Sequence, residues 1–106
     1  MIKARTNKLN KPEDGNFGKV WNYICDQHEI KECFTEGFFN PVGGNLMAGD
    51  MIRMIEIRQN RILSLCEGIV LEVIKTKTGY QVEFHPLSDK IKRFPRGKVI
   101  DKEPST

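Results

Sequence analysis

The side chains best suited to chemistry are three cysteines and two histidines. Cys25, His28 and Cys33 share one short stretch, and thiolates together with imidazoles are ligands that zinc prefers. Cys66 and His85 are remote in sequence, no C-x-x-C pair occurs, and a zinc site needs about four ligands at workable spacing. We therefore expect no metal and no other cofactor, and we interpret the cysteines as small apolar core residues of a reduced protein.

The sequence contains no arrangement that predicts catalysis. Neither histidine has a sequence context that ties its ring to a cysteine or serine nucleophile. Gly43-Gly44 is not followed by Lys-Ser or Lys-Thr, as a phosphate-binding loop requires. Asp50 is the most suggestive single acid, and we expect its side chain to bond nearby backbone where a strand begins. Four more carboxylates fall on separate predicted strands, mostly at expected solvent positions: Glu56, Glu67, Glu72 and Glu83. We therefore expect a protein that is not an enzyme.

The net charge of +3 belongs to the two ends of the chain. Residues 1–18 and 88–106 carry more basic than acidic side chains, whereas the segment 19–87 between them is slightly acidic. The second end holds the basic residues that a polyanion or a partner protein could contact: Lys90, Lys92, Arg93, Arg96 and Lys98. Because +3 on a whole domain is too little to indicate phosphate binding by itself, we interpret both ends as solvated segments.

Length and composition are those of one small soluble domain. The 106 residues are 39% hydrophobic and 29% charged, which is too apolar for disorder and suits a single core. The longest uncharged apolar stretches, such as residues 68–71, are far shorter than the ~20 residues of a membrane span. The N-terminus has no apolar region typical of a secretory signal. We expect no contact with a membrane and a location in the cytoplasm, unless the protein is packaged into a particle.

The first half of the chain predicts an arm, a strand and a helix. Residues 1–18 are polar, contain several turn-forming residues and predict an extended basic arm. Alternation from residue 19 to 25 predicts a first strand. Asp26 and Glu29 have the spacing of a capping box, and the apolar spacing behind them predicts a short helix over 27–36.

Alternating residues and turn signals predict hairpins in the second half. The expected strands are 51–57, 61–66, 69–76 and 80–85, with tight turns at 59–60 and 77–79. The tail 88–106 adds at most an edge strand near residues 98–100. The fold class that follows is mainly β with one short α-helix, as a small antiparallel β-barrel or curled sandwich of about five strands, with the β domain over residues 19–87.

Nucleic-acid binding is the alternative that the strands leave open. Tyr80 and Phe84 share one face of the strand 80–85, and on an open, OB-like barrel they could stack bases beside the basic tail. Val82 lies between them on the same face, a pattern more typical of core residues. A small nucleic-acid-binding barrel is therefore the alternative function rather than the leading one.

An ordered motif runs from the first strand into the second. Its members are Trp21, Tyr23, Asp26, Glu29, Gly37, Phe38, Phe39, Asn40, Leu46, Gly49 and Asp50. The order of these residues resembles small accessory virion proteins of tailed bacteriophages and prophages. In that family a strand with an aromatic residue leads to a short helix, a Gly-aromatic-Phe-Asn turn and a Leu-x-x-Gly-Asp-x-Ile entry to the next strand. The similarity covers roughly residues 19–57, and this chain departs from the family in its more charged helix and longer basic tail.

The resemblance implies a structural role in a particle. Proteins of this kind decorate a phage head or form the attachment base of a fibre, often as trimers. The implied partners are further copies of the chain and other virion proteins, and the implied location is the virion or the cytoplasm of the bacterial host. The leading hypothesis is therefore a phage-derived accessory virion protein that acts by self-association or by binding capsid or tail components.

Overall fold

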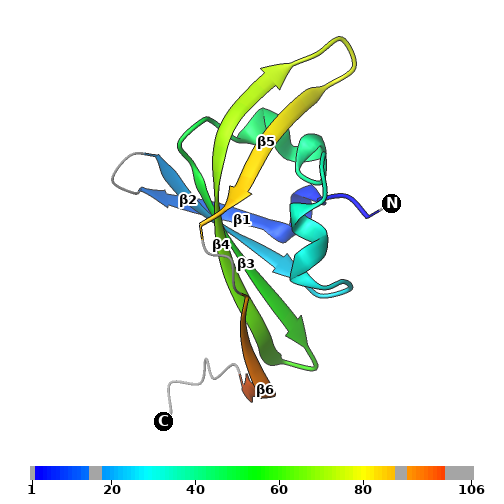
Figure 1. Cartoon of the computed structure of the whole chain (residues 1–106), viewed down its shortest axis with the longest axis vertical. Helices are drawn as coiled ribbons and strands as arrows, with labels where there is room; N and C mark the ends of the chain where they lie inside the picture. Colours follow the sequence, from blue (N-terminus) through cyan, green and yellow to red (C-terminus); the bar gives the residue numbers. More distant parts are fainter. Residues whose placement is uncertain (1, 15–17, 88–90, 100–106) are drawn as a thin grey trace.

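Six strands form one mixed sheet in the computed structural model, which describes residues 2–14, 18–87 and 91–99 (Figure 1). The strands are β1 Leu9–Asp14, β2 Lys19–Cys25, β3 Met51–Arg58, β4 Arg61–Lys75, β5 Tyr80–Pro86 and β6 Lys92–Val99. Their order is β1-β2-β3-β4-β5, and β6 pairs with β4. The expected mainly β fold is confirmed, but the sheet is open and not closed into a barrel. The expectation of purely antiparallel strands is wrong, because β2 and β3 are parallel.

Among the described residues, three short 3-10 helices accompany the sheet: η1 Thr6–Lys8, η2 Ile30–Phe34 and η3 Asn40–Asn45. Parallel neighbours need a crossover connection, and η2 and η3 provide it between β2 and β3 while lying on one side of the sheet (Figure 1). The α-helix expected over 27–36 is therefore wrong, because only a 3-10 helix forms there. Its predicted capping box is also absent, since Glu29 is the N-cap without a side-chain hydrogen bond.

The core lies between the sheet and this crossover. Tyr23 of β2 meets Phe38 and Phe39 edge to face, with ring centroids 5.7 and 5.4 Å apart, a favourable geometry for aromatic pairs. The two phenylalanine rings are 4.9 Å from each other. Apolar side chains from the crossover and from β2 to β5 surround these rings: Cys25, Ile30, Cys33, Val42, Leu46, Ile52, Met54, Cys66, Val70 and Val82.

The N-terminal segment is part of the fold, which corrects the expected arm over residues 1–18. β1 pairs with β2, with Leu9 opposite Tyr23. The Ala4 amide donates to the Phe38 carbonyl at 2.9 Å, and the Arg5 amide donates to the Tyr23 hydroxyl at 2.9 Å. These bonds are all to residues far along the chain, so no local pattern in the polar segment could indicate them.

The second half follows the expected hairpins with two corrections. Gln59 and Asn60 adopt left-handed backbone angles, with φ of 52° and 61°, which confirms the tight turn between β3 and β4. β4 continues through Gly68 as one strand instead of two, and the Phe84 ring lies directly over this glycine. The edge strand expected near 98–100 is the longer β6, which pairs with the first part of β4.

Candidate functional site

The Asp50 side chain joins the two ends of the sequence motif. Its Oδ1 accepts from the Lys19 amide at 2.9 Å, and its Oδ2 accepts from the Trp21 indole Nε1 and from the Met47 amide, each at 3.0 Å. Asp50 is only 2% exposed. The expectation that this acid bonds nearby backbone at a strand entry is confirmed, and its additional bond to Trp21 also fixes β2 against β3.

The remaining motif residues also have structural contacts. Asp26 binds Lys8 at 2.6 Å and Arg5 at 3.0 Å, and the hydrogen bond from Lys8 lowers the pKa of this carboxyl. These two cations take up the carboxylate that a capping box would need. Asn40 Oδ1 accepts from the Val82 amide of β5 at 2.8 Å, and Gly37 has a φ of 81°. The motif therefore connects the crossover to the N-terminal segment and to β5.

The basic residues of the tail are only partly within the described structure. Lys92 and Arg93 are exposed on β6, and the Lys92 ammonium lies 5.8 Å from the centre of the Phe94 ring. The backbones of Arg96 and Lys98 also belong to β6, and Lys90 lies outside the described residues. The structure therefore places four of the five expected contact residues on one edge strand.

The aromatic residues considered for base stacking already have partners within the chain. The Phe84 ring stacks on Phe34 with centroids 5.5 Å apart and planes 11° apart, and it meets Phe39 at 4.8 Å. Tyr80 packs over the backbone of η3, where a Cβ added to Gly43 would lie 2.5 Å from the Tyr80 Cβ. The Phe84 ring packs against the core, as the intervening Val82 predicts, whereas Tyr80 packs against η3.

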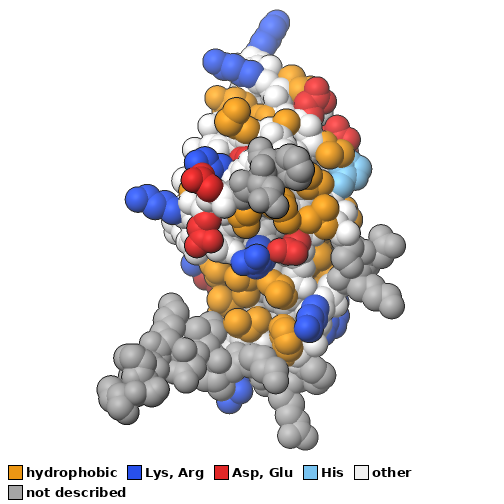
Figure 2. Space-filling view, turned by 90° about the vertical axis from the view of Figure 1, so that its left-hand side faces the viewer, with side chains coloured by type: hydrophobic (Ala, Val, Ile, Leu, Met, Phe, Trp, Pro, Cys, Tyr) orange, Lys and Arg blue, Asp and Glu red, His pale blue; other side chains and the backbone are white. Residues whose placement is uncertain are grey.

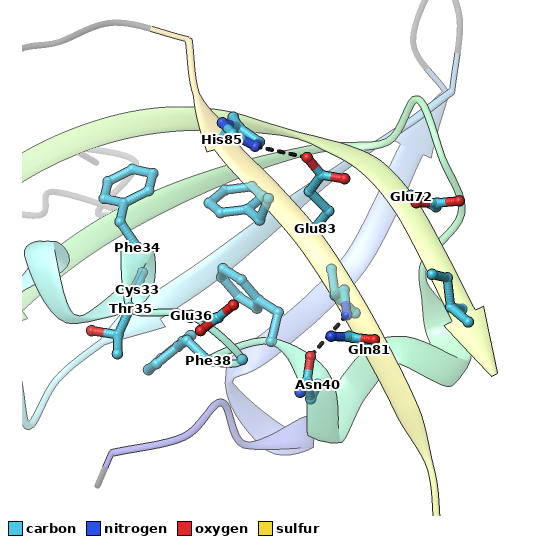
Figure 3. A pocket seen from close by; sticks show the side chains of 15 residues that line it. Cys33, Phe34, Thr35, Glu36, Phe38, Asn40, Glu72, Gln81, Glu83 and His85 are labelled. Carbon is cyan, nitrogen blue, oxygen red and sulfur yellow. Dashed lines mark hydrogen bonds and ion pairs between the residues drawn. The ribbon is translucent and has the colours of Figure 1, made fainter. Parts of the chain in front are cut away.

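A groove of about 470 Å³ runs along β5, beside the segment that follows η2 (Figure 3). Glu36, Glu72 and Glu83 line it, so the groove is acidic. His85 Nε2 lies 3.1 Å from Glu83 Oε2, and both side chains are largely exposed. The sequence did not indicate this groove, because its two walls are far apart along the chain.

One group of thiol and imidazole side chains comes together under the end of β2. Cys25 Sγ and Cys33 Sγ are 3.5 Å apart, and one ligand atom from each of Cys25, His28 and Cys33 lies within 4.8 Å of the others. The hydrogen bond with Cys25, together with burial, raises the pKa of the Cys33 thiol far above its ordinary value. Cys66 is not a member of this group, and burial raises the pKa of its thiol as well.

Glu56 is the buried carboxylate that sequence reasoning missed. The four carboxylates on the strands are expected mostly at solvent positions, but Glu56 is 8% exposed and accepts a hydrogen bond from Ser64 at 2.8 Å. Arg58 approaches it at 3.7 Å and also donates to the Cys25 carbonyl at 2.9 Å. Its partners are Arg58 on the same strand and Ser64 on β4, and the contact with Ser64 depends on how the two strands pair.

The side of the sheet away from η2 and η3 carries an apolar surface, which we call the outer face. Figure 2 shows hydrophobic side chains gathered along the middle of this side, with acidic and basic side chains between them. Strand alternation assigns to it the side chains of Val20, Ile24, Met51, Ile55, Ile57, Leu65, Ile69 and Leu71, which are half-buried except for the exposed Leu71. Arg53 and Glu67 form an ion pair of 3.2 Å among them.

No helix among the described residues is long and apolar enough to cross a membrane. Comparisons of the chain with protein-family models, with curated proteins and with solved structures find no match.

Proposed function

We propose that this protein is a structural subunit that acts by self-association, of the accessory virion kind that its sequence motif resembles. The outer face is the observation that carries the proposal. Alternating strand residues normally place apolar side chains toward a core and polar ones toward water. Here β2, β3 and β4 are apolar on both sides, and a second sheet packed on the outer face would bury the side chains that one sheet leaves half-exposed.

The charges of the outer face favour a second copy of the chain as the occupant. Arg53 and Glu67 are directly opposite each other on β3 and β4, so the centre of the outer face carries a pair of opposite charges. In a two-fold dimer the same patch meets itself, and each Arg53 can then approach the Glu67 of the other copy. A polyanion would instead need an excess of positive charge on the surface it contacts.

The size of the outer face indicates a weak pair. By ordinary strand spacing, three strands of this length offer a surface about 15 Å wide and about 25 Å long, which is roughly 400 Å² per copy. Stable interfaces bury about 800 Å² per partner. A contact of half that size suits a subunit whose many copies are held together in a particle, where multivalency raises the overall affinity.

Charge reversal combined with sedimentation velocity tests the self-association. Arg53→Glu places two acids on the outer face, and Glu67→Arg places two bases there, so each variant alone should associate at least about tenfold more weakly. An equimolar mixture of the two variants should associate again, because opposite charges then face each other. Lys19→Glu is the matched control, since Lys19 pairs with Asp14 in an exposed ion pair elsewhere.

Two results would contradict the proposal. The unmodified protein could remain monomeric up to about 0.5 mM, where a weak interface of this size should be populated. Alternatively, the mixed variants could stay as monomeric as each variant alone. The virion location is tested separately by mass spectrometry of purified particles from a producing strain, and particles without this chain would refute that part.

The nucleic-acid alternative has a separate measurement. Fluorescence anisotropy with single-stranded DNA and RNA should give no binding at low salt, because Tyr80 and Phe84 are engaged within the fold. Salt-dependent binding that is lost when Lys92 and Arg93 are replaced by alanine would favour the alternative instead.

A further inference from the structure

We propose that Cys25, His28 and Cys33 form a binding site for one zinc ion. The inference is independent of the proposed self-association, because the three side chains lie on the side of the sheet that carries η2 and η3, away from the outer face. Cys25 is the last residue of β2, His28 lies in the bend that follows, and Cys33 belongs to η2. The crossover thus returns the second thiol to the end of the strand that carries the first.

The distances are close to those of a zinc site. With Zn–S of about 2.3 Å and Zn–N of about 2.0 Å, tetrahedral angles require S···S of about 3.7 Å and S···N of about 3.5 Å. The two sulfur atoms are 3.5 Å apart, and all three ligand atoms lie within 4.8 Å of one another. Small side-chain movements would therefore bring the three atoms to bonding distance of one ion.

His28 has the arrangement of a metal ligand. Its Nδ1 lies 2.9 Å from the Glu29 carbonyl oxygen, and a carbonyl can only accept, so in the neutral ring Nδ1 carries the proton and Nε2 carries the lone pair. Histidines that bind metals commonly donate their other ring N–H to a carbonyl in this way. Nε2 is buried and has no hydrogen-bond partner, although His28 is only 8% exposed. A buried acceptor without a partner is costly, and a zinc ion would satisfy it.

Charge balance favours a divalent ion such as zinc over monovalent copper. Binding releases one proton from each thiol to solvent, so two thiolates and one neutral imidazole meet a divalent cation and the site is neutral. A neutral site suits its surroundings, because Cys25 and Cys33 are almost fully buried and the Phe38 ring lies 5.4 Å from that of His28. Monovalent copper would leave one buried negative charge, which is unfavourable. In other zinc sites with three protein ligands, a water molecule is the fourth ligand.

The experiment uses cobalt as a spectroscopic probe for zinc. The reduced full-length protein is titrated with Co²⁺ under a phosphine reductant, and one ion per chain should give a thiolate-to-cobalt charge-transfer band and strong visible bands of tetrahedral cobalt. Zinc should displace cobalt and bleach these bands. At a hundredfold excess of zinc over its Kd, the melting temperature should rise by roughly 10 °C.

Variants assign the ligands. Cys33→Ser and His28→Gln should each weaken cobalt binding by more than about 100-fold, because loss of even an outer-shell partner costs 10- to 100-fold. Cys66→Ser is the matched control, since Cys66 is a buried thiol outside the group, and its affinity should be unchanged. Far-ultraviolet circular dichroism establishes that each variant folds. The cobalt spectrum of the unmodified protein tests the site even if a variant does not fold.

The proposal fails if the reduced, unmodified protein gives no tetrahedral cobalt spectrum with excess cobalt. It also fails if Cys66→Ser weakens binding as much as Cys33→Ser does. Formation of a Cys25–Cys33 disulfide in air without any metal uptake under reductant would equally overturn it, because the close pair of thiols would then serve a redox role.

Discussion

Replacing Asp50 with alanine should be among the most destabilising single changes in the chain. The carboxylate accepts three hydrogen bonds, from the Lys19 amide, the Trp21 indole and the Met47 amide. Alanine removes all three acceptor contacts at once and leaves the three donors without a partner. Asp50 itself is only 2% exposed.

The size of the effect follows from these three donors. A buried donor that loses its partner costs about 1–3 kcal/mol, and water reaches partly buried donors, so the lower part of that range applies. The sum is about 3–5 kcal/mol, against a total stability of about 5–15 kcal/mol for a domain of this kind. Asp50→Asn keeps one oxygen for Trp21 and Met47 but turns an N–H toward the Lys19 amide, so it should lose about half as much.

Urea denaturation followed by Trp21 fluorescence measures the difference, because this indole is one of the three donors. With a denaturant slope of about 1.5 kcal/mol per molar, Asp50→Ala should lower the midpoint by about 2 M or more. Asp14→Ala is the control, because Asp14 is an exposed carboxylate that also contacts Lys19, and its midpoint should stay unchanged. A loss below about 1 kcal/mol for Asp50→Ala would refute the reasoning that this acid holds β2 and β3 together.

Two further predictions concern packing and pH. Gly43→Ala would place a Cβ 2.5 Å from the Tyr80 Cβ, so the melting temperature of this variant should fall by about 5–15 °C in a thermal scan. Gly44→Ala should lower it less, because the Cβ at that position would lie 3.2 Å from the Tyr80 ring. The hydrogen bond from Lys8 lowers the pKa of Asp26, so the folded state gains stability above the unfolded pKa of about 3.9 and loses it as the pH falls through the folded pKa. Unfolding curves of Asp26→Asn should therefore differ from the unmodified protein at neutral pH and converge with it in acid, whereas a pH-independent difference would contradict this linkage.

Features encoded by neighbouring residues were predictable. The turn at Gln59 and Asn60 depends on residues that tolerate left-handed angles, and it forms where expected. The alternation that placed Val82 in the core is local too, and Val82 is 7% exposed. The bond between Asp50 and the Met47 amide spans three residues, so a turn pattern was enough to indicate it.

Features that depend on pairing between distant segments were not predictable. The parallel pairing of Trp21 with Ile52 requires a crossover between β2 and β3. The apolar spacing over residues 27–36 predicted a helix there but not the path of this crossover. β1 is a polar segment that becomes a strand because the edge of β2 offers it hydrogen bonds. Glu56 is buried because Ser64 reaches it from the next strand.

Residue types and their order already specify a mainly β chain, the three residues Cys25, His28 and Cys33, and an apolar pattern on both sides of its central strands. Folding of the whole chain brings η2 back to β2, so that the two thiols lie 3.5 Å apart, and it leaves the second apolar side half-exposed on an open sheet. The physical reason is that a one-layer sheet must bury one face to fold. The crossover covers that face and collects the thiols and imidazole beneath it, and the proposed self-association rests on the other face.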